Sequence, residues 1–195
     1  MEAKLPPPPP DLHARPLPVT PLTGLIFRIH RTGLDCLHFG KSGAGRFDDP
    51  HGRYGVLYAS LQPEGAFAEV FLRGLSLMLV READFTGRSM SGIACKSLMV
   101  VDLTGAGLRK VSCDNRISTE IPFHTVGLWS GAFFAHPRQP DGIIYRSRHN
   151  PRFKCVALFD RCKARLGVEP SEALITGRRR QWTANQIDKY GLAIE

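Results

Sequence analysis

The chain has 195 residues, of which 43% are hydrophobic and 23% charged, close to the average for globular proteins. These values exclude a disordered chain, a collagen and a disulfide-rich scaffold, and the length suits one compact domain. The 26 Lys and Arg residues outnumber the 18 Asp and Glu residues, which gives a net charge of +8. Such an excess indicates a nucleic acid partner, a small polyanionic ligand or no more than solubility.

The cysteine spacing and the N-terminal sequence indicate the cellular compartment and whether a metal is bound. The five cysteines are scattered and form no C-x-x-C pair, which argues against a zinc site of that type. There is no H-E-x-x-H, EF-hand or clustered aspartate pattern, so we expect no metal. No basic-then-apolar leader is present and no apolar run reaches the roughly 18–20 residues that cross a bilayer. We therefore expect a cytoplasmic protein with buried free thiols and no membrane partner.

Residues 1–22 contain eight of the 15 prolines. Proline fixes φ and lacks an N–H, so this arm is excluded from a helix or a central strand. We expect it to be extended and poorly packed until about Leu22. It is interpreted either as a solvated leader or as a docking arm for an SH3-like or oligomeric partner.

The folded part is predicted to alternate strands with helices, taken here in chain order. A strand is expected over 24–30, a further short extended piece over 34–39, a glycine-rich loop over 41–53 and a buried strand over 54–59. A helix is predicted from Pro63 to about Arg73, with Glu69 at the edge of its apolar stripe. Strands follow at 98–103, 142–145 and 155–159, partly helical structure at 112–138, and a short terminal helix at 186–192.

Five polar residues stand out because of where the predicted elements place them: in an apolar strand, on the glycine-rich loop, on a buried strand, on a helix and just past a strand. A guanidinium in an apolar strand or on a glycine loop is suited to phosphate, and a carboxylate at the edge of a buried helix face is suited to a polar cleft. These residues are Arg28, Arg46, Tyr58, Glu69 and Ser147.

In order and spacing, this set resembles the RES-domain family, which is named for an Arg, a Glu and a Ser. The resemblance covers roughly residues 25–160 and departs from the usual pattern in reading GAGRF where GGRW is commoner. The matching segments are Arg28, Gly45-Arg46-Phe47-Asp48, Leu57-Tyr58-Ala59-Ser60, Ala66-Phe67-Ala68-Glu69 and Ser147.

The resemblance implies an α+β fold similar to ADP-ribosyltransferase toxins, with a split, mostly antiparallel sheet and flanking helices. It divides the chain into a proline-rich arm (1–22), an NAD-binding catalytic domain (23–160) and a basic C-terminal extension (161–195). Family members are commonly toxins of toxin–antitoxin pairs that consume NAD⁺, which is a substrate here, and are held inactive by an Xre-type antitoxin. A homo-oligomer is kept as an open alternative, since the sequence does not show the oligomeric state.

The roles that the resemblance implies agree with the charges of the reaction. Breaking the nicotinamide–ribose bond generates an oxocarbenium-like ribose, which a nearby carboxylate stabilises; Glu69 is the candidate. Arg28 and Arg46 are expected to bind the pyrophosphate, with Arg46 also counted as catalytic. Tyr58 is expected to stack on nicotinamide or hold its ribose, and Ser147 to bond the ribose or a phosphate.

His30 follows Arg28 by two residues, on the same predicted strand face. It is a candidate NAD contact, although a purely structural histidine would fit the same position.

The sequence is compatible with three kinds of function. The first is NAD⁺ hydrolysis or phosphorolysis, and the second is ADP-ribosyl transfer to a protein. The third is a non-catalytic module that binds nucleic acid or a protein partner through the basic tail around 178–180. No helix-turn-helix, zinc-finger or RNA-recognition signature supports nucleic acid binding, so we do not expect it.

Overall fold

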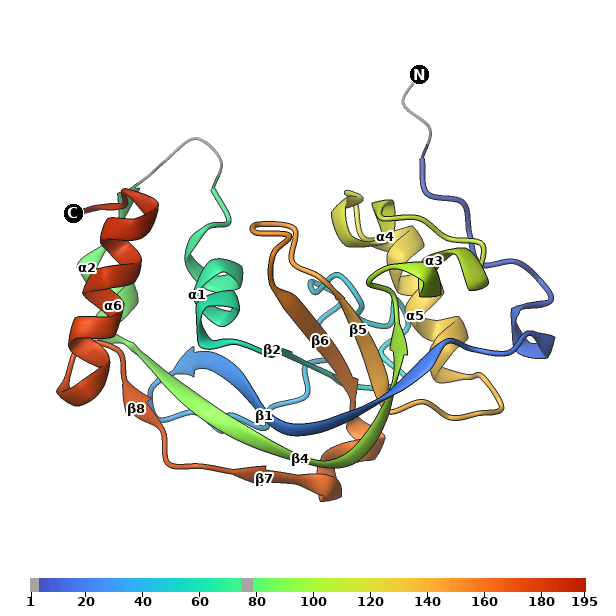
Figure 1. The fold of residues 1–195 in the computed structure, drawn as a ribbon, viewed down its shortest axis with the longest axis horizontal. Coiled ribbons are helices and arrows are strands. Elements are labelled where there is room, and N and C mark those ends of the chain that lie inside the picture. Colours follow the sequence, from blue (N-terminus) through green and yellow to red (C-terminus); the bar gives the residue numbers. More distant parts are fainter. Residues whose placement is uncertain (1–3, 75–78) are drawn as a thin grey trace.

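The computed structural model of the chain describes residues 4–74 and 79–195. It contains a seven-stranded sheet, a separate pair of short strands and helices on the flanks (Figure 1). The strands are β1 (Val19–Arg31), β2 (Val56–Ser60), β3 (Leu79–Val80), β4 (Arg88–Asp102), β5 (Gly142–Arg146), β6 (Lys154–Phe159), β7 (Leu166–Val168), β8 (Glu172–Ala173) and β9 (Ala193–Ile194). The helices are η1 (Leu12–Ala14), α1 (Pro63–Phe71), α2 (Glu82–Thr86), α3 (Ala106–Lys110), α4 (Arg116–Thr119), α5 (His124–Phe134), η2 (Asp160–Arg165) and α6 (Gly177–Tyr190).

The strand pairings form a closed circuit. β1 pairs with β4 along its whole length, from Val19 opposite Val101 to Arg31 opposite Arg88. The circuit continues through antiparallel pairs of β1 with β2, β2 with β6 and β6 with β5. It closes through a parallel pairing of β5 with the end of β4. The sheet is thus mostly antiparallel with helices on its flanks, and the predicted α+β class is confirmed.

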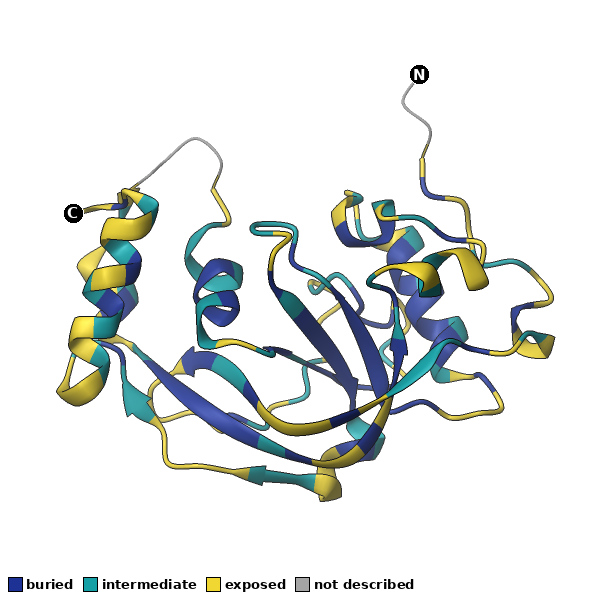
Figure 2. Cartoon of the chain, in the orientation of Figure 1, coloured by how far each residue is buried: buried dark blue, intermediate teal, exposed yellow. Residues whose placement is uncertain are grey.

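Two neighbouring strands of this circuit, β5 and β6, are buried on both faces. β5 and β6 are buried except at their ends and appear dark in Figure 2, as expected for strands that read as continuous apolar runs. Both were predicted close to their observed bounds. The predicted helix at 63 is also present: Pro63 occupies its first turn and it ends at Phe71, slightly earlier than expected.

The expectation that residues 1–22 are poorly packed is wrong. Leu5, Leu12 and Leu17 are at most 5% exposed and join a hydrophobic core cluster that includes Trp129. The indole Nε1–H of Trp129 donates to the carbonyl of Pro6 at 2.8 Å. An extended proline-rich segment keeps its carbonyls free for such bonds, and its interspersed leucines bury apolar surface. The arm therefore lies along α3, α4 and α5 (Figure 1).

The basic C-terminal segment also belongs to the folded body. β7 and β8 pair with β4, and α6 packs Trp182 and Ile187 against a hydrophobic cluster that contains Phe67 of α1. The terminal helix therefore begins at Gly177, well before the predicted start, because its apolar face has a surface to cover. Whether residues 23–160 form a separable catalytic unit stays a prediction.

Three other element predictions differ from the structure. β1 starts at Val19, before the predicted start at residue 24, and pairs with both β2 and β4, so the end of the arm that was excluded from a central strand belongs to one, with Pro21 opposite Met99. The arm also contains one 3-10 turn, η1, although a helix was excluded there.

β4 starts at Arg88, ten residues before the predicted strand at 98–103. Its first half contains Ser89, Ser91 and Gly92, which hide the apolar alternation, and the long pairing with β1 stabilises it instead. Residues 34–39 form turns and no strand.

The expectation of buried free thiols is confirmed. All five cysteines are buried and free of disulfides. Within residues 4–74 and 79–195, no helix has both the length and the apolar character that crossing a membrane requires.

The packed arm predicts a stability effect far from the motifs. Replacing Leu12, which is 1% exposed, with Ala removes buried methyl groups and leaves a cavity, so the free energy of unfolding should fall by about 2–5 kcal/mol. Urea denaturation followed by circular dichroism measures this change. The matched control is Leu34→Ala at a side chain 60% exposed, which should change it by less than about 0.5 kcal/mol. Equal effects would contradict a packed arm.

Candidate functional site

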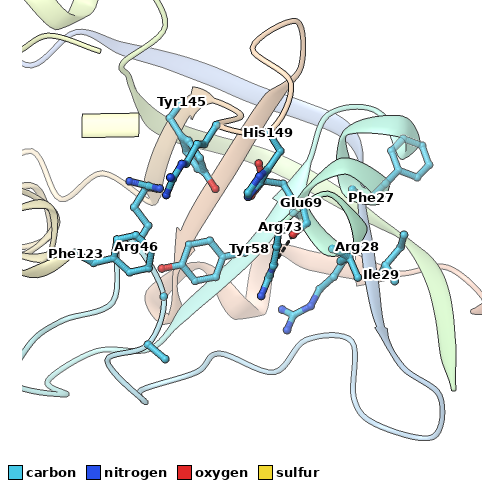
Figure 3. A pocket seen from close by; sticks show the side chains of 16 residues that line it. Phe27, Arg28, Ile29, Arg46, Tyr58, Glu69, Arg73, Phe123, Tyr145 and His149 are labelled. Carbon is cyan, nitrogen blue, oxygen red and sulfur yellow. Dashed lines mark hydrogen bonds between the residues drawn. The ribbon is translucent and has the colours of Figure 1, made fainter. Parts of the chain in front are cut away.

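A cleft of about 410 Å³ opens where β1, β2 and α1 meet the loop before β2 and the turn after β5 (Figure 3). Four of the predicted site residues line it: Arg28 from β1, Arg46 from the glycine loop, Tyr58 from β2 and Glu69 from α1. The closed circuit of strands brings these four elements to one place. Further lining side chains include Phe27, Arg73, Phe123, Tyr145, Arg148 and His149.

The carboxylate of Glu69 is held by Ser147, which the sequence predicted as a ligand contact. The Ser147 hydroxyl donates to Glu69 Oε1 at 2.6 Å and accepts the main-chain N–H groups of His149 at 3.2 Å and Asn150 at 3.1 Å. Because two donors already point at the hydroxyl oxygen, its own hydrogen is left for the carboxylate. Ser147 is 1% exposed and does not line the cleft, so it supports Glu69 from behind.

Tyr58 closes the loop that carries Arg46. Its hydroxyl donates to Asp48 Oδ1 at 2.8 Å and accepts the N–H of Phe47 at 2.8 Å, while Asp48 Oδ2 accepts the N–H of Gly45 at 3.0 Å. A Cβ atom at Gly45 would lie 2.5 Å from Asp48 Oδ1 and 2.6 Å from the Tyr58 hydroxyl. Position 45 therefore requires glycine because of close approach, which explains the second glycine of the GAGRF segment.

Arg46 points across the cleft from this loop. Its Nη1 donates to the carbonyl of Glu120 at 2.9 Å, and the guanidinium carbon lies 4.7 Å from the centre of the Phe123 ring, within cation–π range. Burial lowers the pKa of Arg46, but arginine remains charged at neutral pH. The side chain is thus a partly desolvated cation held by a carbonyl and an aromatic face.

Arg28, on the opposite wall of the cleft, is also a partly desolvated cation. Its Nη1 donates to the carbonyl of His38 at 3.0 Å, and burial lowers its pKa. In the part of the chain that the structure describes, neither Arg28 nor Arg46 forms an ion pair. Both guanidinium groups retain donors for an anion.

The charge of the cleft lining is strongly positive. Among its described residues, four arginines face one carboxylate, that of Glu69. Burial raises the pKa of Tyr58 and of Tyr145 well above the ordinary value, so both phenols stay protonated and neutral. The cleft is therefore suited to a ligand that carries more than one negative charge and a cationic centre near Glu69.

His30 lies outside the residues that line the cleft. It is 8% exposed, and its ring nitrogens bond the Ser91 hydroxyl at 2.9 Å and the carbonyl of Arg31 at 3.0 Å. With both nitrogens engaged by protein groups, His30 is placed as a structural histidine would be.

Three lining residues were not expected from the sequence. Arg73 follows Glu69 by four residues, and its Nε donates to the Glu69 carbonyl at 2.6 Å; helical spacing was a usable signal for it. Tyr145 precedes Ser147 by two residues, so strand alternation was a usable signal as well. Phe123 has no local signal, because only the tertiary fold brings it under Arg46.

A metal centre finds no support among the described side chains. No group of three or more His, Cys, Asp or Glu residues in residues 4–74 and 79–195 is arranged to hold a metal ion.

Comparisons with known proteins bear on the same region. A family model described as the RES domain matches residues 25–183. A curated relative named "Probable toxin y4kH", from Sinorhizobium fredii (strain NBRC 101917 / NGR234), is 36% identical over 101 residues, covering 50% of this chain and 74% of the relative.

Among solved structures, a chain of the M. tuberculosis MbcT–MbcA toxin–antitoxin complex superposes with a TM-score of 0.68 at 15% identity. The superposition covers 87% of this chain and 92% of that chain. The predicted ADP-ribosyltransferase-like fold is confirmed.

The tight approach at Gly45 predicts a cost for adding one methyl group. Gly45→Ala should lower the free energy of unfolding by about 1–3 kcal/mol, because the new Cβ forces the Tyr58–Asp48 bond apart. Thermal or urea unfolding measures the loss. Gly105→Ala is the matched control, since a Cβ there meets nothing within 4 Å; a Gly45 variant as stable as this control would contradict the tight packing of the loop.

Proposed function

The chain belongs to the RES domain family, and from this premise we propose that it is an enzyme that cleaves the nicotinamide–ribose bond of NAD⁺. The observation that carries the proposal is the Glu69 carboxylate, fixed by Ser147 at 2.6 Å in a cleft whose lining also includes four arginines. A dinucleotide with an anionic pyrophosphate and a cationic nicotinamide ring has the charges that this cleft complements.

Cleavage of the nicotinamide–ribose bond does not require a strong general acid to protonate the leaving group. The nicotinamide ring of NAD⁺ is already positive, so it leaves as a neutral molecule when its bond to ribose breaks, and the positive charge moves to the ribose. A carboxylate beside the ribose stabilises this charge more in the transition state than in the ground state. Glu69 fills this role, and Ser147 positions its carboxylate.

The remaining cleft residues are suited to binding the dinucleotide. Arg28 and Arg46 offer guanidinium donors to the pyrophosphate from opposite walls, and the aromatic faces of Tyr58 and Phe123 lie between and beside them (Figure 3). Because Tyr58 also holds the loop of Arg46, its loss would affect binding through two routes.

We further propose that the chain is the toxin of a toxin–antitoxin pair. The support is its family and a relative named as a probable toxin, together with a shared fold with a chain of a toxin–antitoxin complex. Its partner would then be an antitoxin, and the family resemblance implies one of the Xre type. NAD⁺ consumption would make such a protein toxic, because the cofactor is required throughout metabolism.

Two other candidate functions differ in how well they fit the structure. ADP-ribosyl transfer uses the same bond cleavage with a protein acceptor, so it is the second candidate. Nucleic acid binding through the tail is less favoured, because Arg179 pairs with Glu172 at 2.7 Å and Arg161 stacks on Phe134 at 3.8 Å. These cations serve the chain's own fold.

Nicotinamide release from NAD⁺ tests the activity. The purified protein should release nicotinamide, and Glu69→Gln should slow release by about 10²–10³-fold, since an electrostatic stabiliser of the transition state is removed. Ser147→Ala should slow it by about 10–100-fold with KM little changed, because a hydrogen bond to a charged group is lost.

Glu82→Gln on the exposed start of α2 is the control for Glu69→Gln and should match the unmodified protein. Chromatography of the products distinguishes three reactions: free ADP-ribose indicates hydrolysis, a phosphorylated ADP-ribose formed with added phosphate indicates phosphorolysis, and labelled protein indicates transfer. An unmodified protein that releases no nicotinamide would refute the proposed activity.

Growth of a bacterial host tests the toxin role. Induced expression should arrest growth and deplete cellular NAD⁺, and Glu69→Gln should abolish both effects because it retains the fold without the carboxylate. Optical density and NAD⁺ content measure the two effects. Arrest that persists equally with Glu69→Gln would argue for toxicity by another route.

A further inference from the structure

His149 occupies the turn after β5, inside the cleft and next to the serine that holds Glu69. Its side chain lines the cleft and is partly buried, while its main-chain N–H donates to the Ser147 hydroxyl. In the described part of the chain, neither nitrogen of its ring has a hydrogen-bond partner. Such an imidazole contrasts with that of His30, whose two ring nitrogens are both engaged.

Charged and titratable groups from five parts of the fold line the cleft together with the His149 ring. Burial lowers its pKa, Glu69 acts in the opposite direction and the neighbouring arginines add to the lowering. The net effect is a pKa below the ordinary histidine value, so the ring is neutral at pH 7 and able to accept a proton. The groups that line the cleft with it are Glu69 and Arg73 on or after α1, Arg46 on the glycine loop, Tyr58 on β2, Arg28 on β1, and Tyr145 and Arg148 around the end of β5.

We propose that His149 is the general base that takes the proton of the attacking water when the enzyme hydrolyses NAD⁺. This inference rests on the proposed function. It assigns a further catalytic residue to the cleft, beside Glu69, and identifies water as the acceptor that this residue activates.

Bonds and protons balance in this hydrolysis. The C1′–N1 bond of NAD⁺ breaks and its electron pair leaves with neutral nicotinamide. A water oxygen forms a bond to C1′, and one of its protons passes to a ring nitrogen of His149. The imidazolium then releases that proton to solvent, so the net change is NAD⁺ and water giving ADP-ribose, nicotinamide and H⁺.

The remaining cleft residues are poorly suited to this task. The arginines remain protonated at neutral pH, and the raised pKa of Tyr58 and Tyr145 keeps their phenols protonated. Glu69 is needed as an anion beside the ribose cation, and a proton on it would remove that charge. His149 is the lining residue of the described chain that is both neutral and free to accept a proton.

The test compares hydrolysis by the full chain and its variants. His149→Ala and His149→Gln should each lower kcat for hydrolysis by about 10²-fold or more, with KM for NAD⁺ within about twofold. Both variants keep the main-chain N–H that supports Ser147, so the Glu69 site persists, and thermal unfolding checks that they fold. His13→Ala, at an exposed histidine of η1, is the matched control and should equal the unmodified protein.

The pH profile separates a base from a structural residue. Hydrolysis by the unmodified protein should rise with pH through a pKa below the ordinary histidine value of 6.5, as His149 loses its proton, and then level off; this limb should vanish in both variants. Added imidazole should restore part of the rate of His149→Ala, because it enters the vacated space as an external base.

These measurements distinguish failure of the proposed base from failure of the proposed function. No nicotinamide release by the unmodified protein refutes the proposed function, and this inference with it. An active protein whose His149 variants hydrolyse NAD⁺ within about threefold of normal, or keep the acidic limb, overturns the inference and leaves the function intact. Turnover of the unmodified protein only with added phosphate overturns it as well, since the phosphate dianion needs no base.

Discussion

The hydrogen bond from Ser147 to Glu69 is the interaction on which the cleft depends. It joins a helix and a turn that are 78 residues apart in sequence, and it fixes an anion among four arginines. Without a fixed position, a carboxylate in that setting would pair with the nearest guanidinium and lose its orientation toward a ligand. The serine prevents this because its two lone-pair directions are occupied by main-chain N–H groups, which leaves its hydrogen for the carboxylate.

The closed circuit of strands makes this bond possible. β2 carries Tyr58 and leads into α1, while β6 pairs with both β2 and β5, so the helix and the turn after β5 are held on one side of the same sheet. The N-terminal arm and α6 then support opposite ends of the molecule (Figure 1). The arm packs behind α5 through Trp129, and α6 packs against α1 through Trp182 and Phe67.

Much of the site was predictable because its polar residues lie in short local patterns. Four of them lie on a strand, on the glycine loop or at the edge of a helix's apolar stripe, and all four line the cleft: Arg28, Arg46, Tyr58 and Glu69. Phe123 was not predictable, since its contact with Arg46 spans the fold, and neither was the support role of Ser147, which depends on a turn geometry that a sequence does not display. The arm was misjudged because proline content indicates an extended backbone, whereas burial depends on the leucines between the prolines and on a surface formed much later in the chain.

The placement of the two tryptophans has a spectroscopic consequence. Trp129 is fully buried beneath the arm, whereas Trp182 lies at the junction of α6 with the helix that carries Glu69, bonded to Glu64 at 3.4 Å. A single-tryptophan version of the chain would therefore emit fluorescence that reports on one end of the molecule at a time. Detachment of the arm would redshift one emission and detachment of α6 the other, so the order in which the two ends unfold could be observed directly without an attached dye.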